Sequence, residues 1–271
     1  MATNQRIGFI GGGAIAEALI KGVIEAGLAG PEQISVSDIS AERLATLAGQ
    51  YAVTTFTDNM SVAKQSDIVF LTVKPHIVNQ AAQDIQSVLS QETLIVSVAA
   101  GIPLSQIESV LPANPVIRVM PNTPVSVGAG MSAFALGSKA TSVHGSIVRT
   151  ILDAVGKSMI VGEELMDAVT GLSGSGPAYA FVLIDALTDA GVRVGFPRQI
   201  AKLLAAQTLF GAAKMVLETG VHPAALRDGV TSPGGTAITG VHIMEQRGVR
   251  AALIDAVVAA TEKSREMGQR K

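Results

Sequence analysis

Cysteine and tryptophan are absent from this 271-residue sequence, and aromatic residues make up only 3% of it. Without cysteine the chain can form no disulfide, no thiolate metal site and no cysteine nucleophile. The four histidines are scattered and form no H-x-x-x-H pair, so we expect each to be structural or solvent-facing rather than a metal ligand. The sequence therefore predicts no metal site.

Charge is also scarce, because 15% of the residues are charged, the net charge is −2 and no basic cluster is present. These features argue against nucleic acid as a partner. No uninterrupted apolar run reaches the ~18 residues that cross a bilayer, and a strand predicted from Ile7 leaves no room for a signal peptide. We expect a soluble, cytoplasmic protein without a membrane partner.

Apolar residues, at 48% of the chain, and glycine, with 28 residues, are abundant. A chain of this length can form two modest domains with cores of their own. We predict an α/β Rossmann-type dinucleotide-binding domain over residues 1–163 and an all-α domain for substrate binding and dimerisation over residues 164–271. Apolar runs separated by helical segments predict a mainly parallel sheet with strands at 7–10, 33–38, 67–75, 93–101, 116–120 and 130–136.

The first predicted strand runs into the segment GGGAIA, which is followed by an apolar pattern with helical spacing. Gly11 would allow a tight turn, Gly13 would let a pyrophosphate approach the backbone, and Ala16 would let the helix pack closely on the strand. The helix N-terminus would add free N–H groups and a positive dipole end. A glycine turn between a strand and a helix at this place predicts a dinucleotide site.

The second strand ends at Asp38, where an acid typically accepts hydrogen bonds from the adenosine ribose and repels a 2′-phosphate. Asp38 alone favours NADH. Ser37, Ser40 and Arg43 lie close enough in sequence to receive a phosphate if Asp38 turns away, so both NADH and NADPH stay open as cofactors.

Two further polar residues lie where parallel strands would present ligands, beyond their carboxyl ends. Lys74, in the segment VKPH, either contacts a phosphate or is a solvated lysine before a proline turn. Asn59 follows an earlier connection and could reach the adenine or ribose side of the cofactor.

The second half reads as helices, with one helix starting after Ser175 at Pro177 and another between Pro197 and Gly220. The stretch from Ala201 to Ala213 has few polar positions. A helix that is apolar nearly all round must be buried nearly all round, which about 100 residues cannot easily achieve alone. We therefore predict an intertwined homodimer or a larger assembly.

The stretch VTSPGGTAITG interrupts these helices with a proline and glycines. Gly234, Gly235 and Thr236 would present backbone N–H groups at the start of a helix, and Ser232 and Thr236 would add hydroxyl donors. Such a corner suits a carboxylate or a phosphate. The alternative is a capped helical turn, since capping and anion binding use the same groups.

A redox cofactor and an anion pocket together imply hydride transfer to a small anionic substrate. An alcohol dehydrogenase needs a positioned acid or base, usually His or Lys, whereas the helix after GSGPAYA offers only Asp185 and Asp189. A protonated C=N bond needs less help, so an imine is favoured. A β-hydroxyacid dehydrogenase stays open if Lys202 or Lys214 points at the nicotinamide, as does a non-catalytic cofactor-binding regulator.

Six blocks occur in an order that resembles the pyrroline-5-carboxylate reductase family: GFIGGGAIA, VKP, MPNTP, GLSGSGPAYAF, GAAKMVLETGVHP and RDGVTSPGGT. The resemblance covers essentially the whole chain. It implies NAD(P)H-dependent reduction of 1-pyrroline-5-carboxylate to L-proline, the last step of proline biosynthesis. It also implies a Rossmann domain, a helical domain that interlocks in a homodimer, and often a homodecamer of five dimers.

The resemblance also assigns site residues by position. It places the substrate carboxylate on Ser232, Gly234, Gly235, Thr236 and Ala237, and an acidic residue, Glu163, near the substrate, so that Glu163 and Thr236 become the catalytic candidates. It places the cofactor against Ile10, Gly11, Gly12, Gly13, Ala14, Ile15, Asp38, Asn59, Val73, Lys74, Pro75, Val98, Ala99 and Ala100.

One position departs from the family pattern S-P-G-G-x-T, whose final threonine hydroxyl is thought to bind the imine nitrogen. Here Ala237 takes that place, and the threonine is Thr236, one residue earlier. One residue turns a side chain by ~100° about a helix axis. Water or Glu163 would then replace the contact, or the enzyme would be slower, or the substrate would be a relative of pyrroline carboxylate.

Overall fold

The computed structural model describes residues 5–269, which divide into two compact units. Residues up to 175 and those from 259 onward form the first unit, and residues 176–258 form the second. The packing therefore divides the chain after residue 175, which is later than the expected boundary after residue 163. The end of the last helix, from residue 259, packs with the first unit. That cofactor binding belongs to residues 1–163 and substrate binding and dimerisation to residues 164–271 stays a prediction.

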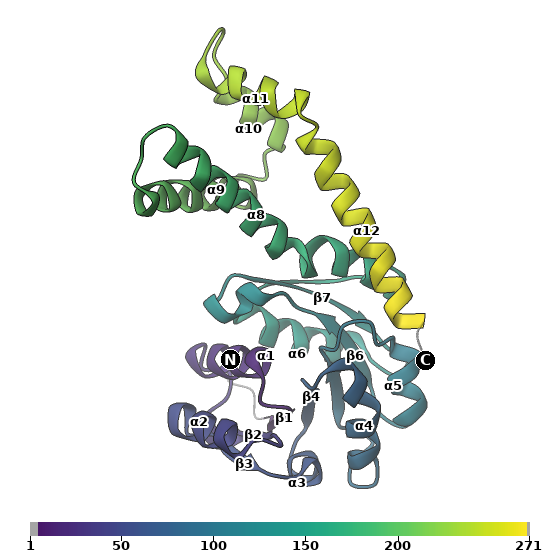
Figure 1. Cartoon of the computed structure of the whole chain (residues 1–271). Helices are drawn as coiled ribbons and strands as arrows, with labels where there is room; N and C mark the ends of the chain where they lie inside the picture. The colour runs from purple at the N-terminus through teal and green to yellow at the C-terminus, as the bar shows by residue number, and fades with distance from the viewer. Residues whose placement is uncertain (1–4, 270–271) are drawn as a thin grey trace. The chain divides into compact units, whose positions relative to one another are not determined.

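The first unit is built on an eight-stranded sheet with the order β3-β2-β1-β4-β5-β6-β7-β8 (Figure 1). Strands β1 to β6 pair in parallel, β7 runs antiparallel to β6, and β8 is parallel to β7. The first six follow the Rossmann order, so the predicted fold class is confirmed. The strands are β1 (Ile7–Ile10), β2 (Ile34–Ser37), β3 (Thr54–Phe56), β4 (Ile68–Leu71), β5 (Leu94–Ser97), β6 (Val116–Met120), β7 (Gly130–Leu136) and β8 (Gly156–Ile160).

Helices cover both faces of this sheet, which explains why its central strands β1 and β4 are apolar throughout. One core is closed by α1 (Ala14–Glu25), α2 (Ala41–Tyr51) and α6 (Ser142–Asp153). The other is closed by α3 (Asn59–Lys64), α4 (Val78–Gln86), α5 (Leu104–Val110) and α7 (Met166–Val169). Short turns lie between them: η1 (Pro31–Gln33), η2 (Pro75–Ile77), η3 (Thr123–Val127), η4 (Glu163–Leu165) and the π-helical turn η5 (Thr170–Gly174).

The second unit contains helices that begin and end where the sequence signals predict. Pro177 lies in the first turn of α8, and Pro197 precedes α9. Gly220 ends α9 in the left-handed region at φ 65°, which glycine adopts without a steric penalty. The helices are α8 (Gly176–Arg193), α9 (Arg198–Thr219), α10 (Pro223–Gly229), α11 (Thr236–Gln246) and α12 (Val249–Gln269), of which the last ends in the first unit.

Helix α9 is largely uncovered in the single chain. Ala201 and Ala205 are its buried residues, whereas Leu203 is 68% exposed and Leu217 is 74% exposed. By length and composition alone α9 could cross a membrane, although no apolar run in the sequence had predicted a span. Within residues 5–269 the structure therefore does not provide the burial that the sequence predicts for this helix.

Candidate functional site

The glycine turn lies between β1 and α1, as the sequence predicts. Gly11 has φ +97°, which an L-residue adopts only with strain, and a methyl group on it would lie 3.0 Å from the Thr72 backbone. Gly13 is the N-cap of α1 in extended conformation, and a methyl group there would meet no atom within 4 Å. The backbone before α1 is thus open on the side where a pyrophosphate would bind.

Asp38 lies directly after β2 and is joined to this turn. The N–H of Gly12 donates to Asp38 Oδ2 at 2.7 Å, and the N–H of Ser40 donates to Asp38 Oδ1 at 2.9 Å. These two bonds fix the carboxylate beside the glycine turn. Asp38 therefore has the position of a ribose-binding acid.

Thr72 connects the turn to the end of β4, and sequence reasoning did not identify it. Its hydroxyl lies within hydrogen-bond distance of two carbonyl oxygens, 2.9 Å from that of Ile10 and 2.6 Å from that of Gly11. Its N–H also donates to the Ile10 carbonyl at 2.9 Å. The sequence signal that could have identified Thr72 is its hydroxyl, which directly follows the apolar strand β4.

The structure brings most of the predicted cofactor residues to one edge of the sheet. Parallel pairing aligns the carboxyl ends of β1, β2, β4 and β5 there. Lys74 is exposed, Ala99 is buried, and the Val98 N–H donates to the Leu71 carbonyl at 3.2 Å. The residues at this edge are Ile10, Gly11, Gly12, Gly13, Ala14, Ile15, Asp38, Val73, Lys74, Pro75, Val98, Ala99 and Ala100.

Asn59 begins α3 and takes part in a polar chain of its own. Its Oδ1 accepts from the Ser37 hydroxyl at 2.8 Å, and its Nδ2 donates to Asp84 Oδ2 at 3.1 Å. Ser37 is the last residue of β2 and directly precedes Asp38, so this hydrogen bond ties Asn59 to the strand end that carries Asp38. Its contact with the cofactor stays a prediction.

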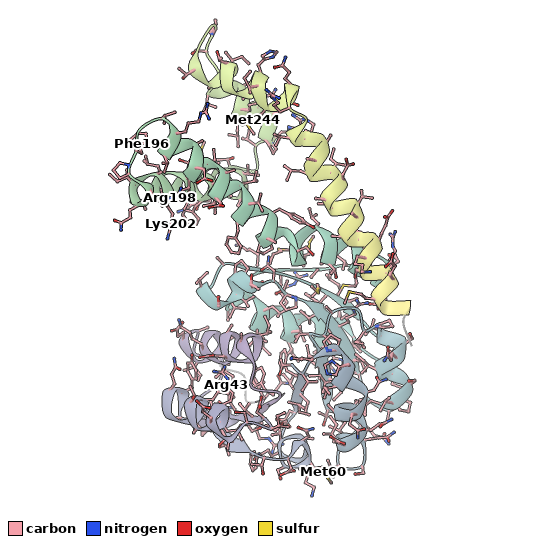
Figure 2. The ribbon with its side chains drawn as sticks, in the orientation of Figure 1. Arg43, Met60, Phe196, Arg198, Lys202 and Met244 are labelled. Carbon is pink, nitrogen blue, oxygen red and sulfur yellow. The ribbon has the colours of Figure 1, made fainter. Side chains whose placement is uncertain are left out.

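Arg43, labelled in Figure 2, joins α2 to α1. Its Nε donates to the Gly12 carbonyl at 2.5 Å, and its Nη2 donates to Glu17 Oε2 at 2.5 Å. The Tyr51 hydroxyl donates a hydrogen bond to Glu17 Oε1 at 3.1 Å. The hydrogen bond from Arg43 is the main cause that lowers the pKa of Glu17, while burial, followed by the bond to Glu17, raises the pKa of Tyr51. Glu17 is thus an ionised member of the network.

Glu163, the catalytic candidate, forms a partly buried ion pair. Its Oε1 accepts from Arg118 Nη1 at 2.7 Å and from the Leu104 N–H at 3.0 Å. The Arg118 side chain is 5% exposed and that of Glu163 33%. Glu163 Oε2 is buried and has no hydrogen-bond partner among residues 5–269. These contacts give Glu163 a structural role between β6 and α5, and its catalytic role stays a prediction.

Arg118 was not identified from the sequence, although a charged residue inside the apolar strand VIRVM signals a buried ion pair. The same strand ends beside the family motif GLSGSG. A methyl group on Gly174 would lie 2.5 Å from Met120 Cε, and Asn122 Nδ2 donates to the Ser173 carbonyl at 3.0 Å. The π-helical turn η5 therefore packs at the carboxyl end of β6, and such turns are frequent at functional sites.

The polar corner of the second unit places backbone N–H groups at the start of a helix. Gly234 has φ +65°, and the Gly235 N–H donates to the Ser232 carbonyl at 2.9 Å. Helix α11 starts at Thr236 without a side-chain cap. Among the described residues, no partner accepts from the N–H groups of Thr236 and Ala237. The first turn of α11 therefore keeps free donors, and the role of these residues in binding an anion stays a prediction.

A Rossmann strand order, an open glycine turn and an acid after β2 define a dinucleotide-dependent oxidoreductase. The curated pyrroline-5-carboxylate reductase of Arabidopsis thaliana is 46% identical over 268 residues, which are 99% of this chain and 97% of that protein. The chain belongs to the pyrroline-5-carboxylate reductase family.

Other comparisons agree with this family. A model described as pyrroline-5-carboxylate reductase dimerisation matches residues 163–267, and one described as coenzyme F420-dependent NADP oxidoreductase matches residues 6–101. The structure of a pyrroline-5-carboxylate reductase from Coxiella burnetii has a TM-score of 0.94 at 34% identity and covers 99% of this chain and 100% of that chain. The structure of Plasmodium falciparum pyrroline carboxylate reductase with NADP bound has a TM-score of 0.88 at 30% identity. It covers 99% of this chain and 100% of that chain.

The chain is therefore an oxidoreductase whose cofactor is NADPH or NADH. The residues at the sheet edge fit such a group, because Gly13 leaves open the space that a side chain would fill and Asp38 offers an acceptor to a ribose. The matched dimerisation domain indicates a homo-oligomer.

Proposed function

We propose that the chain reduces 1-pyrroline-5-carboxylate to L-proline with NADPH or NADH, the last step of proline biosynthesis. The observation that carries the proposal is the open glycine turn before α1, in a chain that matches pyrroline-5-carboxylate reductases over 99% of its length. Without the family match, the same fold would support several hydride transfers.

The first unit would hold the cofactor through its own backbone. The start of α1 binds the pyrophosphate, with Gly13 leaving room for it, and Asp38 accepts from the adenosine ribose. Val98 to Ala100 follow β5 and would line the nicotinamide side. When bound, the reduced nicotinamide supplies a hydride.

The corner from Ser232 to Ala237 would bind the substrate carboxylate through the free N–H groups at the start of α11 and the hydroxyls of Ser232 and Thr236. The imine nitrogen is already protonated, so the electron pair of the C=N bond moves to nitrogen as hydride reaches carbon. No residue has to transfer a proton in that step, and the chain's task is to orient the substrate.

The test is to follow the loss of reduced-nicotinamide absorbance with 1-pyrroline-5-carboxylate and each cofactor. Oxidation of NADH or NADPH, with proline as the product, would support the proposal. If neither cofactor is oxidised, the proposed reaction is wrong. A β-hydroxyacid tried in the reverse direction tests the second oxidoreductase class in the same assay, and failure of both leaves the non-catalytic regulator.

Ala237→Thr is expected to raise kcat/KM by about twofold to tenfold, the effect of one added hydrogen bond to the substrate. Ala237 is the second residue of α11 and directly follows Thr236. The control is Ala237→Val, which adds the same volume without a hydroxyl and should give no increase. Equal kinetics for both variants would mean that another group already contacts the imine nitrogen.

We further propose a dimer, with a decamer as the larger assembly, in the cytoplasm and without nucleic acid or membrane partners. A second copy would cover the apolar side chains of α9 and the groove of about 700 Å³ between α8 and α9. Arg198 and Lys202, labelled in Figure 2, lie along that groove. Light scattering after size exclusion should give an even multiple of the chain mass, and a monomer would contradict the proposal.

A further inference from the structure

Two side chains of opposite charge flank the same glycine of the cofactor turn. A methyl group on Gly12 would lie 3.4 Å from Asp38 Oδ2 and 3.5 Å from Arg43 Cγ. A ribose that reaches Asp38 is therefore also beside Arg43. Asp38 and Arg43 together therefore determine the charge that the site presents to the 2′ position of the ribose.

Asp38 is fixed where a 2′-phosphate would have to lie. The N–H groups of Gly12 and Ser40 each donate to one of its oxygens, which holds the carboxylate against the turn. Each oxygen keeps a lone pair for a ribose hydroxyl. A phosphate at that position would face a fixed negative charge and would bind only if a cation neutralised it.

Arg43 is the residue that could supply this cation, but its guanidinium is already engaged. One nitrogen donates to the Gly12 carbonyl and another to Glu17, whose second oxygen accepts from Tyr51. The side chains of Arg43 and Glu17 are only 27% and 28% exposed, so water screens this pair less than it would a surface pair. Glu17 thus neutralises Arg43 and restrains its direction.

We propose that Glu17 is a specificity-determining residue, which makes the site select NADH over NADPH by keeping the Arg43 guanidinium engaged and so unavailable to a 2′-phosphate. Asp38, Glu17 and Arg43 together carry one net negative charge, so the site repels a 2′-phosphate and accepts a ribose diol. Glu17 acts through Arg43 and is therefore a positioning residue. The inference rests on the cofactor site of the proposed function, but not on the identity of the imine substrate.

The experiment measures the dissociation constants of NADH and NADPH by calorimetry, without substrate, on the full-length chain. The wild type should bind NADPH at least about tenfold more weakly than NADH. Glu17→Gln should lower that ratio by about fivefold or more, because Arg43 is then free to meet the phosphate. Asp38→Asn should lower it as well.

The matched control is Glu42→Gln, which removes the same charge from an exposed residue next to Arg43 in sequence. Within the described part of the chain, residues 5–269, Glu42 forms no ion pair. Its ratio should equal that of the wild type. A merely structural role for Glu17 would weaken both cofactors together and leave the ratio unchanged, which would overturn the inference, as would a wild type that prefers NADPH. Normal binding ratios without turnover of 1-pyrroline-5-carboxylate would instead contradict the proposed reaction alone.

Discussion

Replacing Gly13 with valine is expected to weaken the binding of both NADH and NADPH by about 100-fold, or about 2.7 kcal/mol. The added side chain would enter the open space in front of α1, where the pyrophosphate needs to approach the N–H groups. The backbone at Gly13, with φ −68° and ψ −176°, suits any residue, and the altered cap should cost at most about 1 kcal/mol of stability. Calorimetric titration and thermal unfolding measure the two effects separately.

Gly49→Val is the control for Gly13→Val. Gly49 lies in α2, and a methyl group there also meets no atom within 4 Å. This variant should keep wild-type affinity, since it adds the same side chain away from the turn. If Gly13→Val binds either cofactor as tightly as Gly49→Val does, the glycine turn is not the phosphate site.

Glu163→Ala is expected to lower the free energy of unfolding by about 3 kcal/mol, because it leaves the Arg118 charge buried without a partner. It also removes the acceptor for the Leu104 N–H at the start of α5. Urea unfolding at one fixed protein concentration measures the change, since oligomerisation adds to the apparent stability.

The neighbouring exposed residue provides the matched control for this ion pair. Glu164→Ala should change stability by less than about 0.5 kcal/mol. A double variant, Arg118→Met with Glu163→Leu, should recover most of the loss, since it removes both charges. Equal stabilities of Glu163→Ala and Glu164→Ala would refute the structural role.

Glu163→Gln separates the structural role from the predicted catalytic one. Glutamine keeps the size of the side chain and an oxygen that can accept from Arg118 and Leu104. A fall in kcat of the folded protein, with cofactor affinity retained, would favour catalysis. Lower stability with normal kcat would favour the ion pair alone.

The parts of the fold that local physical chemistry determines were predictable from the sequence. The turn at Gly11 needs a positive φ, so a glycine marks it. Pro197 marks the start of α9 because proline restricts φ, and Gly220 marks its end because glycine permits a positive φ. The strand β3 (Thr54–Phe56) was not predicted, since three residues at a sheet edge carry no periodic pattern.

Interactions between distant residues were harder to predict. Arg118 and Glu163 are 45 residues apart, and nothing in the sequence pairs them. The bond from Gly12 to Asp38 likewise depends on how two parallel strands align their ends. The apolar pattern of α9 predicts that the helix is covered but does not say by which molecule, so its exposure in the single chain became visible only in the structure.

The last residues of α12 belong to the first unit, where the Ser264 hydroxyl donates to Asp167 at 2.7 Å and Gly268 lies against the Gly101 carbonyl. During synthesis the ribosome makes these residues after the whole second unit. The strands of the first unit, to which these residues belong, are made earlier. Domains usually fold in the order in which they are made. The contacts that the end of α12 makes with the nucleotide-binding unit can therefore form only after the helical unit has been translated.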